Sequence, residues 1–189
     1  MREMLFRVLE KGERMLSQAG LARQFGISTS TVNHCLEPLR QMNAVEVRPR
    51  SLAIVNERKI LLYWASKRNL KKETAYATRT VETAEEVEKS LPPGTALAAF
   101  SAYKQRFGEA PADYGEVYCY AGEEELEEIK RRFPARQGPA NLFVLKKDEK
   151  FDEYGKITLA QTYVDLWNIG TWNAQEVLKK LDEKIGGGE

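Results

Sequence analysis

Two helix signals follow each other closely between Ser17 and Ser28, and no other feature of the chain constrains its fold as much. Ser17 is a suitable N-cap for a helix that runs through Phe25, because its hydroxyl can accept a backbone N–H of the first turn. Gly26 can adopt the left-handed conformation that ends a helix, and Ser28 can cap another helix immediately afterwards. The sequence therefore predicts two short helices joined by a tight turn.

The second of these helices is predicted to have one apolar and one polar face. Its apolar residues recur every three or four positions and should form a buried stripe, made of Val32, Leu36, Leu39 and Met42. The opposite face is polar within the first two turns and holds Thr29, Ser30, Asn33 and His34. Because proline removes a backbone hydrogen bond, we expect a kink at Pro38, beyond this polar face.

A two-stranded hairpin is predicted to follow the second helix. Val45 and Val47 alternate with charged residues, and apolar residues resume at Leu52 after a turn. Arg48 and Arg50 give the hairpin a basic tip. Two helices, a tight turn between them and a hairpin, in this order, are typical of a winged helix-turn-helix, in which the second helix enters the major groove of DNA.

The residues expected to contact DNA lie in the first turns of the second helix and at the hairpin tip. They are Ser28, Thr29, Ser30, Thr31, Asn33, His34, Arg48 and Arg50. The alternative is that this domain serves protein contacts alone, without binding DNA.

The net charge of +1 conceals an uneven distribution along the chain. Residues 1–72 hold 14 Lys and Arg against 6 Asp and Glu, whereas residues 73–189 hold 15 against 22. A basic segment attracts the phosphates of nucleic acid, while an acidic one is repelled by them and better suits proteins or solvent. We therefore expect two domains with different partners, divided near residue 72.

The first domain, residues 1–72, is predicted to begin with a helix over residues 1–15 and to end with a connecting helix over residues 57–67. The connecting helix contains Ile60, Leu61 and Trp64 and is more apolar than a free linker, so it either packs on the second domain or pairs with a second copy. We expect a homodimer, since two copies can read two half-sites. The segment KRNLKK at residues 67–72 is interpreted as a hinge.

The second domain, residues 73–189, alternates strand-like and helix-like segments. Strands are expected over residues 74–79, 117–120 and 141–145, and helices over residues 84–91, 96–107, 123–133, 159–166 and 173–185, before a Gly-rich tail. Such alternation predicts an α/β or α+β domain, in which helices pack on a sheet.

Three segments of the second domain carry a resemblance to a known family: GTALAAFSAYKQRFG, GEVYCYAG and TLAQTYVDLWN. With the winged helix, they resemble the antitoxin or transcriptional-regulator proteins of the AbiEi type, from type IV abortive-infection toxin–antitoxin systems. The resemblance implies a repressor of its own operon. It also implies a second domain similar to a degenerate nucleotidyltransferase fold, which counteracts a separate nucleotidyltransferase-like toxin.

We do not expect an enzyme, although a nucleotidyltransferase-like activity is a further alternative. Such an enzyme needs a Gly-Ser turn and two carboxylates on one side of a strand, to hold magnesium ions. Here Gly94 is followed by Thr95, and Asp113 and Glu116 lie three positions apart. No metal or cofactor is expected, because the two cysteines lack paired spacing and His34 is the sole histidine.

Gln161 and Asp165 are separated by four positions and should share one face of a helix. They are candidates for a partner-binding surface. The alternative is that these two polar side chains tie the helix to the sheet.

The composition also bears on location. No apolar run approaches the roughly 20 residues of a membrane span, and the first residues, MREMLFRVLEKGERML, are amphipathic rather than signal-like. We expect a cytoplasmic protein without a membrane partner.

Overall fold

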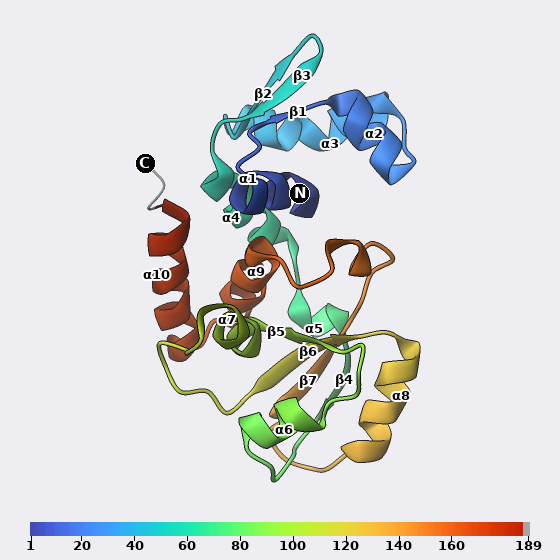
Figure 1. Ribbon diagram of the computed structural model, residues 1–189, viewed down its shortest axis with the longest axis vertical. Coiled ribbons are helices and arrows are strands. Elements are labelled where there is room, and N and C mark those ends of the chain that lie inside the picture. Colours follow the sequence, from blue (N-terminus) through green and yellow to red (C-terminus); the bar gives the residue numbers. More distant parts are fainter. Residues whose placement is uncertain (187–189) are drawn as a thin grey trace. The chain divides into compact units, whose positions relative to one another are not determined.

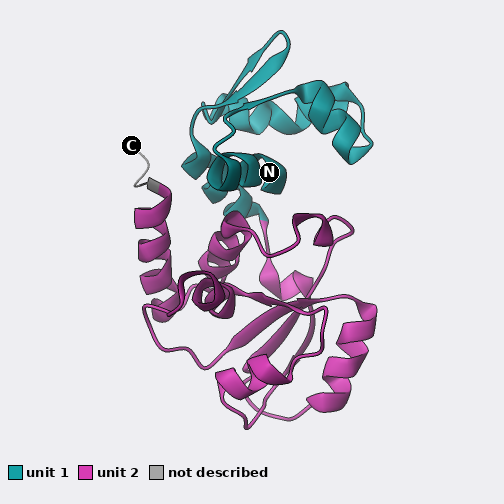
Figure 2. Ribbon diagram, viewed as in Figure 1, with its two compact units in different colours: residues 1–67 teal, residues 68–189 magenta. Residues whose placement is uncertain are grey.

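The computed structural model describes residues 1–186, so the end of the predicted Gly-rich tail lies outside the described residues. The chain divides into two compact units, Met1–Lys67 and Arg68–Glu189 (Figure 2). The division lies five residues before the one predicted near residue 72, and residues 68–72 belong to the second unit. Residues 1–67 hold 11 Lys and Arg against 6 Asp and Glu, and the first unit therefore remains basic.

The first unit contains four helices and a small antiparallel sheet (Figure 1). The helices are α1 Arg2–Lys11, α2 Gln18–Phe25, α3 Thr29–Gln41 and α4 Glu57–Lys67. The strands are β1 Met15–Leu16, β2 Val45–Arg48 and β3 Ser51–Ile54, in the order β1-β3-β2.

The two adjacent helices have the predicted caps. The Ser17 hydroxyl accepts the backbone N–H of Gly20 at 3.2 Å, and the Ser28 hydroxyl accepts that of Thr31 at 3.0 Å. Gly26 ends α2 with φ +62°, in the left-handed region where glycine has no Cβ to clash. The prediction of two helices joined by a tight turn is confirmed.

Two elements of the first unit differ from the sequence prediction. The helix expected over residues 1–15 ends at Lys11, because Gly12 adopts φ +69° and closes it. Met15 and Leu16 then form β1, which pairs with Ala53 and Leu52 of β3. The pairing partner of β1 lies far along the chain, so a local helical pattern could not predict it.

The second unit is built around a four-stranded sheet. Its strands are β4 Thr74–Thr78, β5 Ala96–Ala98, β6 Val117–Ala121 and β7 Leu142–Lys146, in the order β4-β7-β6-β5. Only the central pair, β6 and β7, is parallel. The helices are α5 Leu70–Glu73, α6 Ala84–Ser90, α7 Ala99–Phe107, α8 Glu123–Arg132, α9 Leu159–Ile169 and α10 Trp172–Gly186, with a 3₁₀ turn at Asp152–Tyr154.

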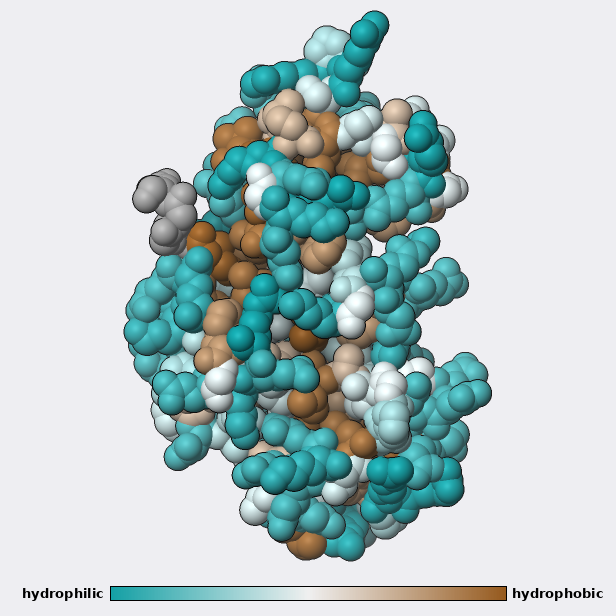
Figure 3. All heavy atoms as spheres, viewed as in Figure 1, coloured by the Kyte–Doolittle hydropathy of each residue, from teal (hydrophilic) through white to brown (hydrophobic). Residues whose placement is uncertain are grey.

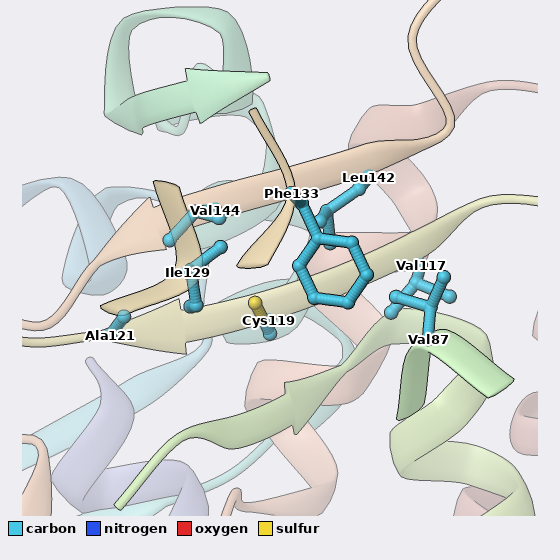
Figure 4. Close-up of a cluster of buried hydrophobic side chains, with 8 residues drawn as sticks. All are labelled: Val87, Val117, Cys119, Ala121, Ile129, Phe133, Leu142 and Val144. Carbon is cyan, nitrogen blue, oxygen red and sulfur yellow. The ribbon is translucent and has the colours of Figure 1, made fainter. Parts of the chain in front are cut away.

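Helices cover both faces of this sheet. On one face, α6 and α8 pack against β6 and β7 (Figure 4), through a cluster of eight buried residues: Val87, Val117, Cys119, Ala121, Ile129, Phe133, Leu142 and Val144. Alternate residues of β6 point the other way, and Tyr120 among them reaches α9. The chain is therefore of mixed α/β class, as predicted.

The helix expected over residues 96–107 begins three residues later. Ala96–Ala98 form strand β5, whose residues pair with Tyr120, Cys119 and Tyr118 of β6. Ala99 then adopts φ +49° as the chain changes from strand to helix. Pairing with the buried β6 outweighs the high helix propensity of alanine and leucine in this three-residue segment.

Candidate nucleic-acid interface and buried polar cluster

The first turns of α3 present a continuous polar surface. All six residues predicted there are exposed, namely Ser28, Thr29, Ser30, Thr31, Asn33 and His34. On the opposite face, Val32, Leu36 and Leu39 are at most 5% exposed, while Met42 is half-buried. Burial of one face therefore fixes which side of α3 is available to a ligand.

Within this surface, the hydroxyls of Ser28 and Thr31 serve the helix itself. They lie 2.8 Å apart and share a hydrogen bond, and the Ser28 oxygen also caps the helix. Asn33 accepts a hydrogen bond from Arg40 Nη1 at 3.3 Å, and the same guanidinium nitrogen lies 3.3 Å from Glu37. Because these pairs are exposed, each contributes little free energy to folding. The side chains can therefore give up these bonds to bind another partner.

The β2–β3 hairpin carries the two predicted arginines at or next to its tip. Arg48 and Ser51 are paired, which leaves Pro49 and Arg50 as the turn. Arg50 and Arg48 are both exposed, and Figure 3 shows hydrophilic residues at this tip. Arg48 Nη2 donates to Glu46 Oε2 at 2.8 Å, and this bond lowers the pKa of Glu46. Arg48 therefore has an acidic partner on its own strand.

A second cluster of polar side chains lies inside the second unit. Arg68 donates from Nη1 to Asp165 Oδ1 at 2.5 Å and from Nη2 to the Tyr120 hydroxyl at 2.9 Å. It also forms an ion pair with Glu73. The Arg68 side chain is only 8% exposed, so this is a buried cation held by two carboxylates.

Asp165 receives hydrogen bonds from several sides but on one oxygen only. Tyr120 donates to Oδ1 at 2.8 Å and Gln161 Nε2 at 3.0 Å, in addition to Arg68. Asp165 Oδ2 is buried and has no hydrogen-bond partner. A buried oxygen without a hydrogen bond costs free energy, and this cost makes the ionised form of Asp165 less favourable.

Burial determines the protonation of this cluster. It raises the pKa of Asp165 to about 6, against the opposing effect of Arg68, Tyr120 and Gln161. Burial alone would lower the pKa of Arg68, but the charges and hydrogen bonds of Asp165 and Glu73 raise it above its usual value. Arg68 therefore stays charged, while Asp165 titrates much nearer to neutrality than an exposed aspartate.

This geometry corrects one interpretation of the sequence and refines another. Gln161 and Asp165 do share a helix face, but they are 3% and 0% exposed and do not form a surface that a partner can reach. They tie α9 to the sheet through Tyr120 instead. The boundary between the two units lies within the segment KRNLKK, between Lys67 and Arg68, whereas α5 begins at Leu70 and Arg68 is anchored in the interior of the second unit.

Arg68 was missed because its charge was counted with that of its basic neighbours. Its partner Asp165 lies 97 positions away, so nothing local distinguishes it from Lys67 or Lys71. The one available signal was that a carboxylate buried on α9 requires a cation from elsewhere in the chain.

Within residues 1–186, no three side chains of histidine, cysteine, aspartate or glutamate are grouped so that they could hold a metal ion. None of the helices in the described part of the chain has the length and apolar character needed to cross a bilayer.

The chain matches no protein-family model and no curated protein.

Proposed function

We propose that residues 1–67 form a winged helix-turn-helix that binds double-stranded DNA in a sequence-specific manner, and that the protein is a transcriptional regulator. The observation that carries this proposal is the polar surface of α3. Its first two turns expose hydroxyl, amide and imidazole groups, while the opposite face of the helix is buried. An exposed polar helix face next to a hairpin with arginines at its tip suits a major groove flanked by phosphates.

Within this proposal the polar residues have different roles. Asn33 is the best candidate for reading a base, because a side-chain amide can bond two atoms of an adenine edge. Thr29, Ser30 and His34 lie on the same exposed surface, and each contributes a single hydrogen bond to the DNA. Ser28 and Thr31 shape the start of the helix, and Arg48 and Arg50 bind phosphates.

The resemblance to AbiEi-type antitoxins supports a more specific role. We infer a cytoplasmic repressor of its own operon, whose second unit is an inactive nucleotidyltransferase-like domain that counteracts a nucleotidyltransferase-like toxin. Since Gln161 and Asp165 are buried, a toxin would have to contact other residues of this unit. We also infer a homodimer that uses α4, where Leu62 is 39% exposed. Sedimentation should show self-association that Leu62→Glu weakens.

DNA binding can be tested by fluorescence anisotropy with the full-length protein over a range of salt concentrations. If Arg50 contacts a phosphate, Arg50→Ala should weaken binding to every duplex and reduce the salt slope by about 0.9. Arg131→Ala, at a 77% exposed arginine of the second unit, is the matched control and should change neither quantity. Absence of salt-dependent binding would favour an adaptor that contacts proteins alone.

A further inference from the structure

The second unit contains a cavity that the proposed DNA-binding function does not use. Its volume is about 450 Å³, and it lies between the start of α5, strands β6 and β7, and the end of α9. The lining residues that matter here are Arg68, Lys71, Tyr118, Phe143, Asn168 and Ile169. Small-molecule sites in proteins are commonly 300–1,000 Å³ in volume, so this cavity is large enough for a ligand.

An aromatic pair forms one part of the lining. Tyr118 and Phe143 are paired neighbours on β6 and β7, and their rings stack with centroids 4.6 Å apart and an angle of 9° between the planes. Tyr118 is held in place, because its hydroxyl donates to Glu116 at 3.0 Å. Each ring covers the inner face of the other, so a planar ligand can extend this stack only on an outer face of the pair.

Two cationic side chains also line the cavity. Among the lining residues, the two charged ones are Arg68 and Lys71, and both are cations. Asp165 and Glu73 do not line the cavity but offset the charge of Arg68, so Lys71 supplies the net positive charge of the lining. Lys71 is exposed and can move toward a ligand.

Arg68 is positioned before any ligand arrives. Its hydrogen bonds to Asp165, Glu73 and Tyr120 use four of the five guanidinium N–H donors. One N–H of Nη1 remains for an anion. A guanidinium that is already fixed loses little conformational entropy on binding, which favours affinity.

We infer that this cavity binds a small molecule with a planar aromatic ring and one anionic group. The ring extends the Tyr118–Phe143 stack on its outer face, and the anion lies near Lys71 and Arg68. A nucleoside monophosphate and an aromatic carboxylate share this chemistry, and the test distinguishes them.

Isothermal titration calorimetry of the full-length protein tests the proposal with three probes: AMP, indole-3-acetate and uncharged adenosine. At least one anionic probe should bind with a Kd below about 1 mM, and adenosine should bind more weakly than AMP if AMP is bound. Binding of AMP alone or of indole-3-acetate alone would identify the ligand class as a nucleoside monophosphate or as an aromatic carboxylate. Absence of heat from both anions up to about 10 mM would overturn the proposal.

Variants then locate the site. Lys71→Ala should weaken binding of the anionic probe about fivefold, since one exposed charge contact is lost. Lys72→Ala is the matched control, because Lys72 is also exposed but does not line the cavity. Ile169→Trp should fill the cavity and abolish binding in a protein that melts like the parent. Equal effects of the two lysine variants, or full binding by a folded Ile169→Trp protein, would place the ligand elsewhere and contradict the inference.

Discussion

Arg68 and Asp165 lie 97 positions apart in the sequence, and Arg68 Nη1 donates to Asp165 Oδ1 at 2.5 Å inside the second unit. Arg68 directly follows Lys67, the last residue of α4, so the second unit holds its own first residue by a buried ion pair. We therefore expect a fragment of the second unit to be most stable when it includes Arg68.

Arg68→Met should destabilise the second unit by about 3–5 kcal/mol, because it leaves the carboxylate of Asp165 buried without its cation. Urea unfolding monitored by tryptophan fluorescence measures this loss. Arg131→Met removes an arginine whose ion pair with Glu128 is largely exposed, and should cost less than about 1 kcal/mol. Similar losses in the two variants would show that the buried pair is not important for stability.

The same pair predicts a difference between two fragments. Residues 68–189 retain Arg68, whereas residues 73–189, the second domain as divided by charge in the sequence, do not. The shorter fragment should therefore unfold at a lower urea concentration. If both fragments have the same unfolding midpoint, Arg68 contributes nothing to the fold.

Asp165 should make stability depend on pH below neutrality. Its pKa is raised to about 6 in the folded protein, from an ordinary value of 3.8 that we assign to the unfolded chain. Between these values the folded protein binds more protons. The contribution of Asp165 to stability is thus fully present below about pH 4 and is lost as the pH rises through about 6.

This dependence is measured as the free energy of unfolding of the wild type minus that of Asp165→Asn. The difference should fall between about pH 4 and about pH 6 and level off above that range. Asp152→Asn serves as the control, since the Asp152 side chain is 78% exposed. A difference that rises with pH would mean that Arg68 and its neighbours lower the pKa of Asp165 more than burial raises it.

Glu46 should weaken DNA binding in the proposed regulator, because it competes with phosphate for Arg48. Glu46→Gln should therefore strengthen binding to any duplex about two- to fivefold at low salt, and less at high salt. Anisotropy titrations at two salt concentrations check this. Glu127→Gln removes an exposed carboxylate that is paired with Lys130 in the second unit, and should leave affinity unchanged. Equal gains in both variants would reflect net charge alone.

Local signals in the sequence predicted much of the first unit. Ser17, Gly26 and Ser28 act through neighbours within three or four positions, so capping rules placed both ends of α2 and the start of α3. Strands β1 and β5 were missed, because both depend on pairing with distant strands. A segment as short as Ala96–Ala98 carries too weak a preference of its own to identify it as a strand.

The candidate sites differ in the same way. Exposure of the polar face of α3 follows from helical periodicity, which the sequence displays directly. The cluster around Arg68 and the cavity beside it are formed by α5, two central strands and α9, which only the folded chain brings together. Gln161 and Asp165 showed a shared helix face, but the sequence left open whether that face was buried.

Selection from a random duplex library shows whether the exposed face of α3 reads DNA sequence. Full-length wild type and Asn33→Ala are each used to select bound duplexes, with Ser90→Ala in the second unit as a control. We predict that the wild type enriches one motif and that Asn33→Ala loses preference at a defined base pair, worth about 1–3 kcal/mol, while random-sequence binding changes little. Failure of the wild type to enrich any motif, or an identical motif from Asn33→Ala, would contradict this account of α3.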